Sequence, residues 1–260
     1  MKISGGQAAI NYKPNKTIMN TSQTLQQLQS LRLTGMHEHY KEVLKLPAHQ
    51  HPASHELLAS LVHAEEESRV NRKTDRYVKL AKFRYQAGLS SVDLTADRGM
   101  DKSALSALSD CSFIDKGQNI MITGATGCGK SFLATAIGQQ ACSLGYKVLY
   151  ISMPQLADQL IMSIADASRI KFMKKLSKPQ VLILDDFGIS PMDDIQRMAL
   201  LQIMEDRYDR KSIIITGQLP FKAWYEYIGE PTLADAIMDR LTAGAHKIEL
   251  KGESLRKRKK

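Results

Sequence analysis

The stretch Gly124-Ala-Thr-Gly-Cys-Gly-Lys-Ser131 decides the fold of this 260-residue chain. It fits the pattern G-x-x-x-x-G-K-[ST], in which glycines let backbone N–H groups crowd round an anionic phosphate where a Cβ would clash. The lysine carries a positive charge to the β- and γ-phosphates of a nucleotide, and the serine offers a hydroxyl to Mg²⁺. We therefore predict that this stretch is a phosphate-binding loop, called the P-loop below.

The flanking sequence supports this prediction. Residues 119–123 form a short apolar run of strand character, and residues 132–141 continue as a helix pattern. A helix that begins at the loop adds its own N–H groups and dipole to phosphate binding. A chance glycine turn would not need all these parts in this order. The expected ATP contacts are Gly124, Ala125, Thr126, Gly127, Cys128, Gly129, Lys130, Ser131 and Phe132.

A second motif supplies carboxylates. The stretch Val181-Leu-Ile-Leu-Asp185-Asp186 is an apolar strand, typical of a strand buried on both faces, that ends in two acidic residues. We expect Asp185 to hold Mg²⁺ together with Ser131. Asp186 stands where hydrolytic P-loop proteins place the carboxylate that orients or deprotonates the attacking water. Most proteins of this class have glutamate there, so the shorter side chain predicts slow or assembly-dependent hydrolysis. The alternative for Asp186 is a helix cap or a surface charge.

Three further polar residues follow apolar segments. A buried strand ends at Thr216, and either Thr216 or Gln218 could sense the γ-phosphate from the neighbouring strand; capping and turn formation are the alternative. Arg240 stands at a helix end and could reach the γ-phosphate of a neighbouring subunit, or it could form a local ion pair with Asp239 or Glu205. The expected catalytic residues are Lys130, Asp186, Thr216, Gln218 and Arg240.

Strand and helix patterns alternate through residues 111–250, which predicts an α/β domain with a mostly parallel sheet between helices. The expected strands are 118–123, 147–151, 181–184, 212–216 and 247–250, and the expected helices are 129–143, 154–176, 193–209 and 232–242. Residues 21–110 are predicted to be a small all-helical domain for DNA binding or oligomerisation. Residues 1–20 are expected to be a flexible leader, with Met19 as an alternative start, and residues 251–260 a basic tail.

The charge balance favours an anionic partner, nucleic acid first and an acidic membrane surface second. Lysine and arginine number 36 against 27 acidic residues, so the formal net charge is +9. Steps of three and four residues place five cations along one helical stripe, which we call the basic stripe. If the glutamates at 65–67 neutralise it, the stripe is simply a solvated helix face. The basic stripe comprises Arg69, Arg72, Lys73, Arg76 and Lys79.

Other classes of protein are disfavoured. Cys111, Cys128 and Cys142 form no CxxC pair, so we expect neither a disulfide framework nor a zinc site, and a reducing cytoplasm fits. No apolar run approaches the ~18 residues that cross a bilayer, and we expect neither a membrane anchor nor a signal peptide.

Seven segments together point to one family. They are Leu31-Arg-Leu-Thr-Gly-Met36, the P-loop, Leu182-Ile-Leu-Asp-Asp-Phe-Gly188, Gln218-Leu-Pro220, Trp224-Tyr-Glu-Tyr-Ile-Gly-Glu-Pro231, Ala234-Asp-Ala-Ile-Met-Asp-Arg-Leu241 and Ile248-Glu-Leu-Lys-Gly-Glu-Ser254. With them the chain resembles, from about residue 20 to 256, an IstB-like transposition helper ATPase of the AAA+ class, similar to DnaC-type helicase loaders. The P-loop and the acidic strand end occur in P-loop ATPases generally, whereas segments 224–231 and 248–254 are much more specific to this family.

The resemblance implies an ATP-dependent oligomer on duplex DNA that helps a partner transposase capture target DNA, with hydrolysis resetting the assembly. It implies that Arg240 is an arginine finger. Arg256 could be a second phosphate sensor, although the chain has no room for the usual helical lid. Three alternatives stay open: a replicative helicase loader, a small-molecule P-loop kinase, and a module that binds nucleotide without hydrolysis.

Overall fold

The computed structural model describes residues 20–92, 99–100 and 102–255, so the expected leader, most of the basic tail and Arg256 lie outside the described residues. Contacts divide the chain between Arg69 and Val70 into two compact units, each described by itself. The boundary predicted at 110/111 falls inside the second unit, because Leu105 and Leu108 of helix α4 (Lys102–Ser109) are buried in that unit's core.

The first unit is helical. It contains α1 (Thr21–Ser30), α2 (Thr34–Val43), a 3-10 turn (Ala48–Gln50) and the first part of α3 (Ser54–Ala81). A capping box of Asn20 and Gln23 begins α1. The chain turns sharply between α1 and α2, where Arg32 has a positive φ of 58°.

Glu65 joins α3 to the start of α2. Its buried carboxylate accepts the N–H groups of Gly35 (2.8 Å) and Met36 (3.4 Å) and the Arg69 guanidinium (2.7 Å). Burial alone would raise the pKa of Glu65, but Arg69 and the two backbone donors hold it below its ordinary value of 4.5. Gly35 allows the close approach, because a Cβ there would lie 2.1 Å from the Ala64 carbonyl oxygen.

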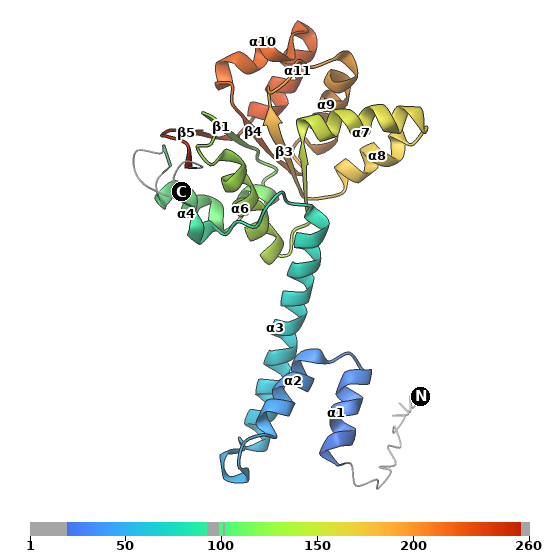
Figure 1. Ribbon diagram of the computed structural model, residues 1–260, viewed down its shortest axis with the longest axis vertical. Coiled ribbons are helices and arrows are strands. Elements are labelled where there is room, and N and C mark those ends of the chain that lie inside the picture. Colours follow the sequence, from blue (N-terminus) through green and yellow to red (C-terminus); the bar gives the residue numbers. More distant parts are fainter. Residues whose placement is uncertain (1–19, 93–98, 101, 256–260) are drawn as a thin grey trace, which may run out of the picture. The chain divides into compact units, whose positions relative to one another are not determined.

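The second unit is built on a five-stranded parallel sheet in the order β2-β3-β4-β1-β5 (Figure 1). All five predicted strands are present, with ends that differ by a few residues. They are β1 (Ile120–Gly124), β2 (Val148–Ser152), β3 (Val181–Phe187), β4 (Ser212–Gly217) and β5 (His246–Leu250).

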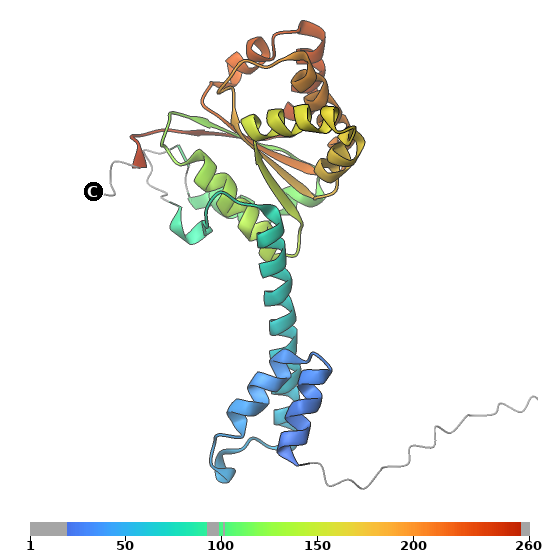
Figure 2. The same cartoon turned by 45° about the vertical axis from the view of Figure 1, so that its right-hand side comes forward.

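Helices cover both faces of the sheet, as the alternating pattern predicted (Figure 2). Alternation along β1 explains the two cores: Ile120 and Ile122 are buried with α6 on one side, and Met121 is buried with α7 and α9 on the other. The helices after α4 are α5 (Ser112–Asp115), α6 (Lys130–Ser143), α7 (Met153–Ala165), α8 (Arg169–Ser177), α9 (Asp194–Arg207), α10 (Trp224–Ile228) and α11 (Pro231–Thr242).

The prediction of one helix over 154–176 is wrong. The chain leaves helix geometry between α7 and α8, where the Asp166 carboxylate accepts the Ser168 N–H (3.0 Å) and Ala167 has a φ of 55°. Apolar residues continue at helical spacing on either side, because Leu160 of α7 and Phe172 of α8 pack in the same core. Hydrophobic periodicity therefore could not reveal the break.

A buried arginine, Arg207, links the segment before β3 to the first residue of β4. Arg207 is 1% exposed, and its guanidinium donates to four carbonyl oxygens at 2.7–3.1 Å. Burial lowers its pKa to about 9, which still leaves it charged at neutral pH. The acceptors are the carbonyls of Leu176, Pro179, Gln180 and Ser212.

The topology brings the two predicted motifs to one edge. All strands are parallel, so their carboxyl ends meet there, and β4 lies between β1, which leads into the P-loop, and β3, which carries Asp185 and Asp186. Across the described ranges, no helix is both long and apolar enough to cross a membrane.

Candidate nucleotide site and basic helix

The P-loop glycines adopt backbone conformations that other residues rarely take. Gly124, Gly127 and Gly129 have φ values of 147°, 83° and 103°, and α6 begins at the next residue. A Cβ at Gly124 would lie 2.2 Å from the Leu250 carbonyl oxygen, so this position tolerates no side chain. The loop therefore meets the demands of a phosphate cradle at a helix N-terminus.

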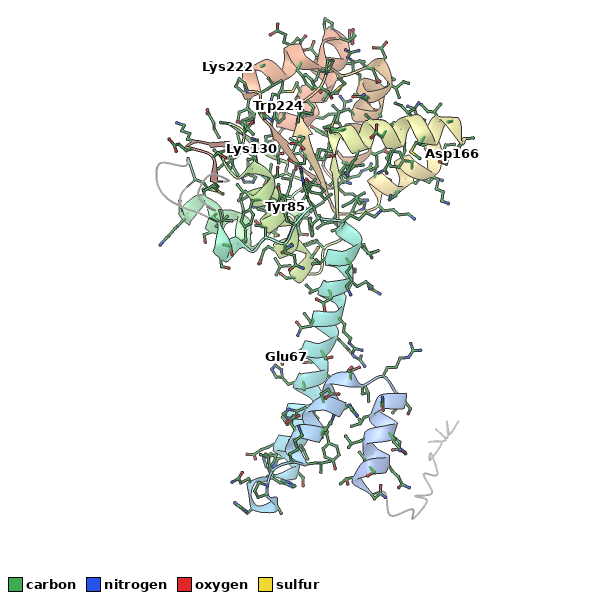
Figure 3. The ribbon with its side chains drawn as sticks, in the orientation of Figure 1. Glu67, Tyr85, Lys130, Asp166, Lys222 and Trp224 are labelled. Carbon is green, nitrogen blue, oxygen red and sulfur yellow. The ribbon has the colours of Figure 1, made fainter. Side chains whose placement is uncertain are left out.

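Lys130 carries its charge over this loop. The residue is 8% exposed, and its Nζ donates to the carbonyls of Gly124 (2.8 Å) and Ala125 (2.9 Å). Figure 3 labels Lys130 at the start of α6. An ammonium held above a ring of glycine backbone is placed to meet the β- and γ-phosphates of ATP.

Asp185 is held by four hydrogen-bond donors. Its carboxylate is fully buried, and its Oδ1 accepts hydrogen bonds from Ser131 Oγ (2.9 Å), Thr216 Oγ1 and the Asp186 N–H (3.0 Å). Its Oδ2 accepts the Tyr150 hydroxyl. Because Mg²⁺ prefers oxygen ligands, the contact between Ser131 and Asp185 fits the predicted metal pair.

Tyr150 was not predicted from the sequence. It lies on β2, beside β3, and its hydroxyl reaches Asp185 because a tyrosine is long enough to extend past the strand end. Burial first, and then the hydrogen bond to Asp185, raise the pKa of Tyr150 well above its usual value. The hydroxyl therefore stays protonated and donates. One phenol among the apolar residues Val148, Leu149 and Ile151 was the signal that could have identified it.

The structure separates the two sensor candidates. Thr216 contacts the Asp185 carboxylate, whereas Gln218 accepts a hydrogen bond from the Thr126 hydroxyl of the P-loop (2.9 Å). The loop that carries Gln218 is anchored by Trp224, which is fully buried and donates from Nε1 to the Leu219 carbonyl (2.9 Å). Trp224 is the first residue of 224–231, one of the segments on which the family resemblance rests.

Asp186 lies beside Asp185 in a different environment. It has a φ of 62°, its side chain is 27% exposed, and its Oδ2 lies 3.7 Å from Nη1 of Arg84. It does not cap the following helix, since Asp193 begins α9 by accepting the Gln196 N–H. Arg84 was not among the predicted site residues.

Arg240 lies far from its own P-loop. Its Nη2 pairs with Glu205 at 3.3 Å, and its carbonyl accepts a hydrogen bond from Asn119, the residue before β1. Gly124, where the P-loop begins, is five residues after Asn119. A strand rises ~3.3 Å per residue, so Gly124 lies roughly 16 Å from Asn119. The local ion pair considered from the sequence therefore forms, and Arg240 cannot serve the nucleotide site of its own chain in this arrangement.

Two further predicted contacts take specific roles. Phe132, next to Ser131, stacks on Tyr85 with 6.5 Å between ring centroids, and Cys128 is buried beneath the loop. The chain after β5 returns to the P-loop, where the Leu255 N–H donates to the Gly127 carbonyl (2.9 Å).

The basic stripe lies on α3 with all five side chains exposed. Arg69 is engaged by Glu65 in the first unit. In the second unit, Lys73 Nζ and Arg76 Cζ lie 5.6 and 5.5 Å from the ring centroid of Tyr77, which is buried in the core. The charged groups of Lys73 and Arg76 thus pack over the ring of the buried Tyr77.

Comparisons with known proteins agree with this geometry. The family described as IstB-like ATP binding protein matches residues 26–260. The insertion sequence ATP-binding protein y4pL of Sinorhizobium fredii is 41% identical over 90% of this chain and 96% of its own length. The ATP-binding protein of insertion sequence IS5376 from Geobacillus stearothermophilus is 33% identical over 88% and 92%.

Solved structures share the fold. The DnaC helicase loader is similar with a TM-score of 0.54 at 22% identity, over 66% of this chain and all of that one. DnaA from Aquifex aeolicus, bound to AMPPCP, gives a TM-score of 0.54 at 18% identity, over 67% and 53%. The predicted α/β fold of the AAA+ class is confirmed. The chain belongs to the IstB-like ATP-binding proteins associated with insertion sequences.

Proposed function

We propose that this protein is a Mg²⁺-dependent ATPase that assembles on duplex DNA and assists a partner transposase in capturing target DNA. Lys130 and the P-loop amides bind the phosphates, and Ser131 and Asp185 hold Mg²⁺, which supplies charge neutralisation when bound. Gln218, linked to Thr126, is placed to respond to the γ-phosphate.

Hydrolysis in this proposal depends on Asp186. A carboxylate on the strand end next to the metal ligand is suited to orient the attacking water. Asp186→Asn should keep ATP bound and leave the protein trapped on DNA, because the substitution removes the base and keeps the shape. Equal turnover in variant and parent would show that another group orients the water, or that the parent hydrolyses no ATP.

The observation that carries the DNA-binding proposal is the basic stripe. Four of its cations lie in the same unit as the nucleotide site, and those at 73 and 76 are supported by Tyr77. Cations at steps of three and four along a helix can follow a phosphate backbone without reading bases. We therefore expect largely sequence-independent binding to duplex DNA that weakens steeply with salt.

The test reverses three charges of the basic stripe on α3. Arg72, Lys73 and Arg76 are changed to Glu, and duplex affinity is measured by fluorescence anisotropy at several salt concentrations. Each lost phosphate contact should reduce the slope of log affinity against log salt by about 0.9, so three should reduce it by roughly 2.7. An unchanged slope in the variant would refute the assignment.

A matched control reverses the same amount of charge elsewhere. Lys171, Lys174 and Lys175 are exposed on α8, and changing them to Glu removes as much positive charge. If net charge alone governs binding, both triple variants lose affinity equally. If only the α8 variant loses affinity, DNA binds there and the stripe on α3 is a solvated face.

Assembly into a homo-oligomer is proposed because Arg240 lies away from its own site and 30% exposed. The transposase is proposed as partner because relatives over nine-tenths of the chain are named for insertion sequences. Likeness to helicase loaders is limited to the fold. Co-purification with the transposase of the same element, and not with a replicative helicase, is the expected outcome; the reverse would favour the loader.

A further inference from the structure

We infer that Ser254 and Leu255 form a clasp that holds the P-loop in its phosphate-binding conformation, and that bound nucleotide holds the clasp closed in turn. Leu255 is in this sense a positioning residue, which acts through the carbonyl of Gly127. The inference deepens the proposed function and rests on it, because it takes the P-loop as the nucleotide site. It also concerns the end of segment 248–254, which carries the family resemblance and has no part in the site described so far.

The chain after β5 runs along the P-loop. β5 lies at the edge of the sheet and pairs in parallel with β1, so that Leu250 stands opposite Gly124, the first residue of the loop (Figure 1). Residues 251–253 are exposed, and a φ of 93° at Gly252 turns the chain there. The next two residues, which form the clasp, then lie against the loop.

Each residue of the clasp meets a different glycine. A Cβ on Gly127 would lie 2.2 Å from Ser254 Oγ and 2.8 Å from Ser254 Cβ. A Cβ on Gly129 would lie 3.4 Å from Leu255 Cδ1, so the Leu255 side chain lies close to this second glycine. The absence of a side chain at Gly127 therefore leaves the space in which Ser254 packs.

The clasp fixes the direction of one peptide group of the loop. In a trans peptide group the C=O and the N–H point in opposite directions. In the group that joins Gly127 to Cys128, the carbonyl accepts the Leu255 N–H (2.9 Å), and the N–H donates to the Ala125 carbonyl (3.3 Å). Lys130 Nζ donates to the same Ala125 carbonyl (2.9 Å). Leu255 thus holds this group from outside the P-loop, and Ala125 holds it from within.

The direction of this peptide group matters because a phosphate cradle points N–H groups at its anion. A glycine rotates its backbone more freely than other residues. Without the hydrogen bond from Leu255, the group after Gly127 can turn its carbonyl oxygen inward, where it repels phosphate. With that hydrogen bond the loop is already in its binding conformation, so less ordering opposes the binding of nucleotide.

The clasp is poised to open and close. Ser254 and Leu255 are only half-buried, and the three residues before them are exposed. Segments with few buried contacts open locally at a small cost in free energy. Coupling between two events is reciprocal, so a clasp that strengthens nucleotide binding is itself stabilised by nucleotide to the same factor. The state of the nucleotide site is thereby transmitted to the residues after β5.

The experiment measures binding of the ATP analogue AMPPCP with Mg²⁺ to the 260-residue chain by calorimetry. Leu255→Pro removes the N–H that the Gly127 carbonyl accepts. It should weaken binding about tenfold, the order expected when a hydrogen bond to a charged group is lost. Leu255→Ala keeps the N–H and shortens the side chain, so it should weaken binding only about twofold.

Two shortened chains separate the clasp from the residues that follow it. A chain that stops after Glu253 lacks the clasp and should lose as much affinity as Leu255→Pro. A chain that stops after Leu255 keeps the clasp and should bind like the parent. Thermal melts without nucleotide should be alike in all variants, because the clasp acts on the loop and not on the core.

Hydrogen exchange tests the reciprocal half of the inference. In the parent, AMPPCP with Mg²⁺ should slow exchange of the Leu255 N–H about tenfold, the same factor by which the clasp strengthens binding. Lys130→Ala at the same analogue concentration is the control and should show little slowing, since its nucleotide site is weakened. Exchange at Leu255 that does not respond to nucleotide in the parent would refute the coupling.

The inference is overturned if folded Leu255→Pro binds AMPPCP as tightly as Leu255→Ala. It is also overturned if the chain that stops after Leu255 loses as much affinity as the one that stops after Glu253, because residues 256–260 would then support binding. If Leu255→Pro does not fold, the two shortened chains decide the question. Failure of the proposed nucleotide site looks different, since the parent itself would not bind AMPPCP.

Discussion

Replacing Arg240 with alanine separates a local role from a role in a neighbouring subunit. Within its own chain Arg240 makes a 3.3 Å ion pair with Glu205 and donates to the Ala236 carbonyl. The pair is 30% and 53% exposed. Its loss should therefore cost at most about 1 kcal/mol of unfolding free energy. For a unit of this size that is a fall in Tm of roughly 2–4 °C.

The in-trans role predicts a much larger effect on turnover. Loss of an arginine finger lowers kcat by about 10³-fold or more, which corresponds to roughly 4 kcal/mol of transition-state stabilisation. The local contact cannot account for that loss. Glu205→Gln is the matched control, since it breaks the same ion pair and keeps the guanidinium. It should share the small stability loss and retain turnover.

The assay is subunit mixing under conditions where sedimentation shows co-assembly on DNA. An Arg240→Ala chain supplies an intact P-loop, and a Lys130→Ala chain supplies an intact Arg240. The mixture should regain part of the DNA-stimulated ATPase activity that both lack alone. Turnover of Arg240→Ala within tenfold of the parent, or a co-assembled mixture as inactive as its components, would refute the in-trans finger.

Further predictions concern the P-loop, the sensor candidate Gln218 and two buried charged residues, Arg207 and Glu65. Lys130→Ala should weaken Mg-ATP binding roughly 100-fold, since two charge-assisted contacts are lost, and unchanged affinity by calorimetry would contradict the site. Gln218→Ala should lower turnover about tenfold or more while ATP affinity stays within threefold; equal losses in both would mean that Gln218 only shapes the loop. Arg207→Met should lower the unfolding free energy by about 3 kcal/mol, because four buried carbonyls lose a charged donor, and denaturant titration showing under 1 kcal/mol would exclude this. The lowered pKa of Glu65 contributes stability that is present above pH 4.5 and lost as the pH falls through the lowered value, so thermal melts of Glu65→Gln should respond less to acid than those of the parent.

The parts of the site that lie within one stretch of sequence could be predicted. The P-loop and the acidic strand end are local patterns, and their contact through Ser131 and Asp185 follows once the strands are parallel. Burial on both faces of β3 and β4 was readable from unbroken apolar runs. These features depend on neighbouring residues, which a sequence displays directly.

Features that depend on strand order or on backbone turns could not be predicted. Tyr150 matters only because β2 lies beside β3. Arg240 is remote because its carbonyl contacts Asn119, just before β1, whereas the P-loop begins at Gly124, where β1 ends. The break at Ala167 is set by a positive φ that apolar spacing does not register. Each of these facts requires a spatial relation between segments distant in sequence, or a single dihedral angle.

The two adjacent carboxylates illustrate how position in the fold divides work between like residues. Asp185 is fully buried and receives donors from α6, β2, β4 and its own strand, so four hydrogen bonds fix the direction of its carboxylate. Asp186 is partly exposed, in a left-handed conformation that turns its side chain toward Arg84. A metal ligand needs the first environment, because a misdirected oxygen costs affinity. The water-orienting role proposed for Asp186 is suited to the second environment, because the attacking water must reach the carboxylate.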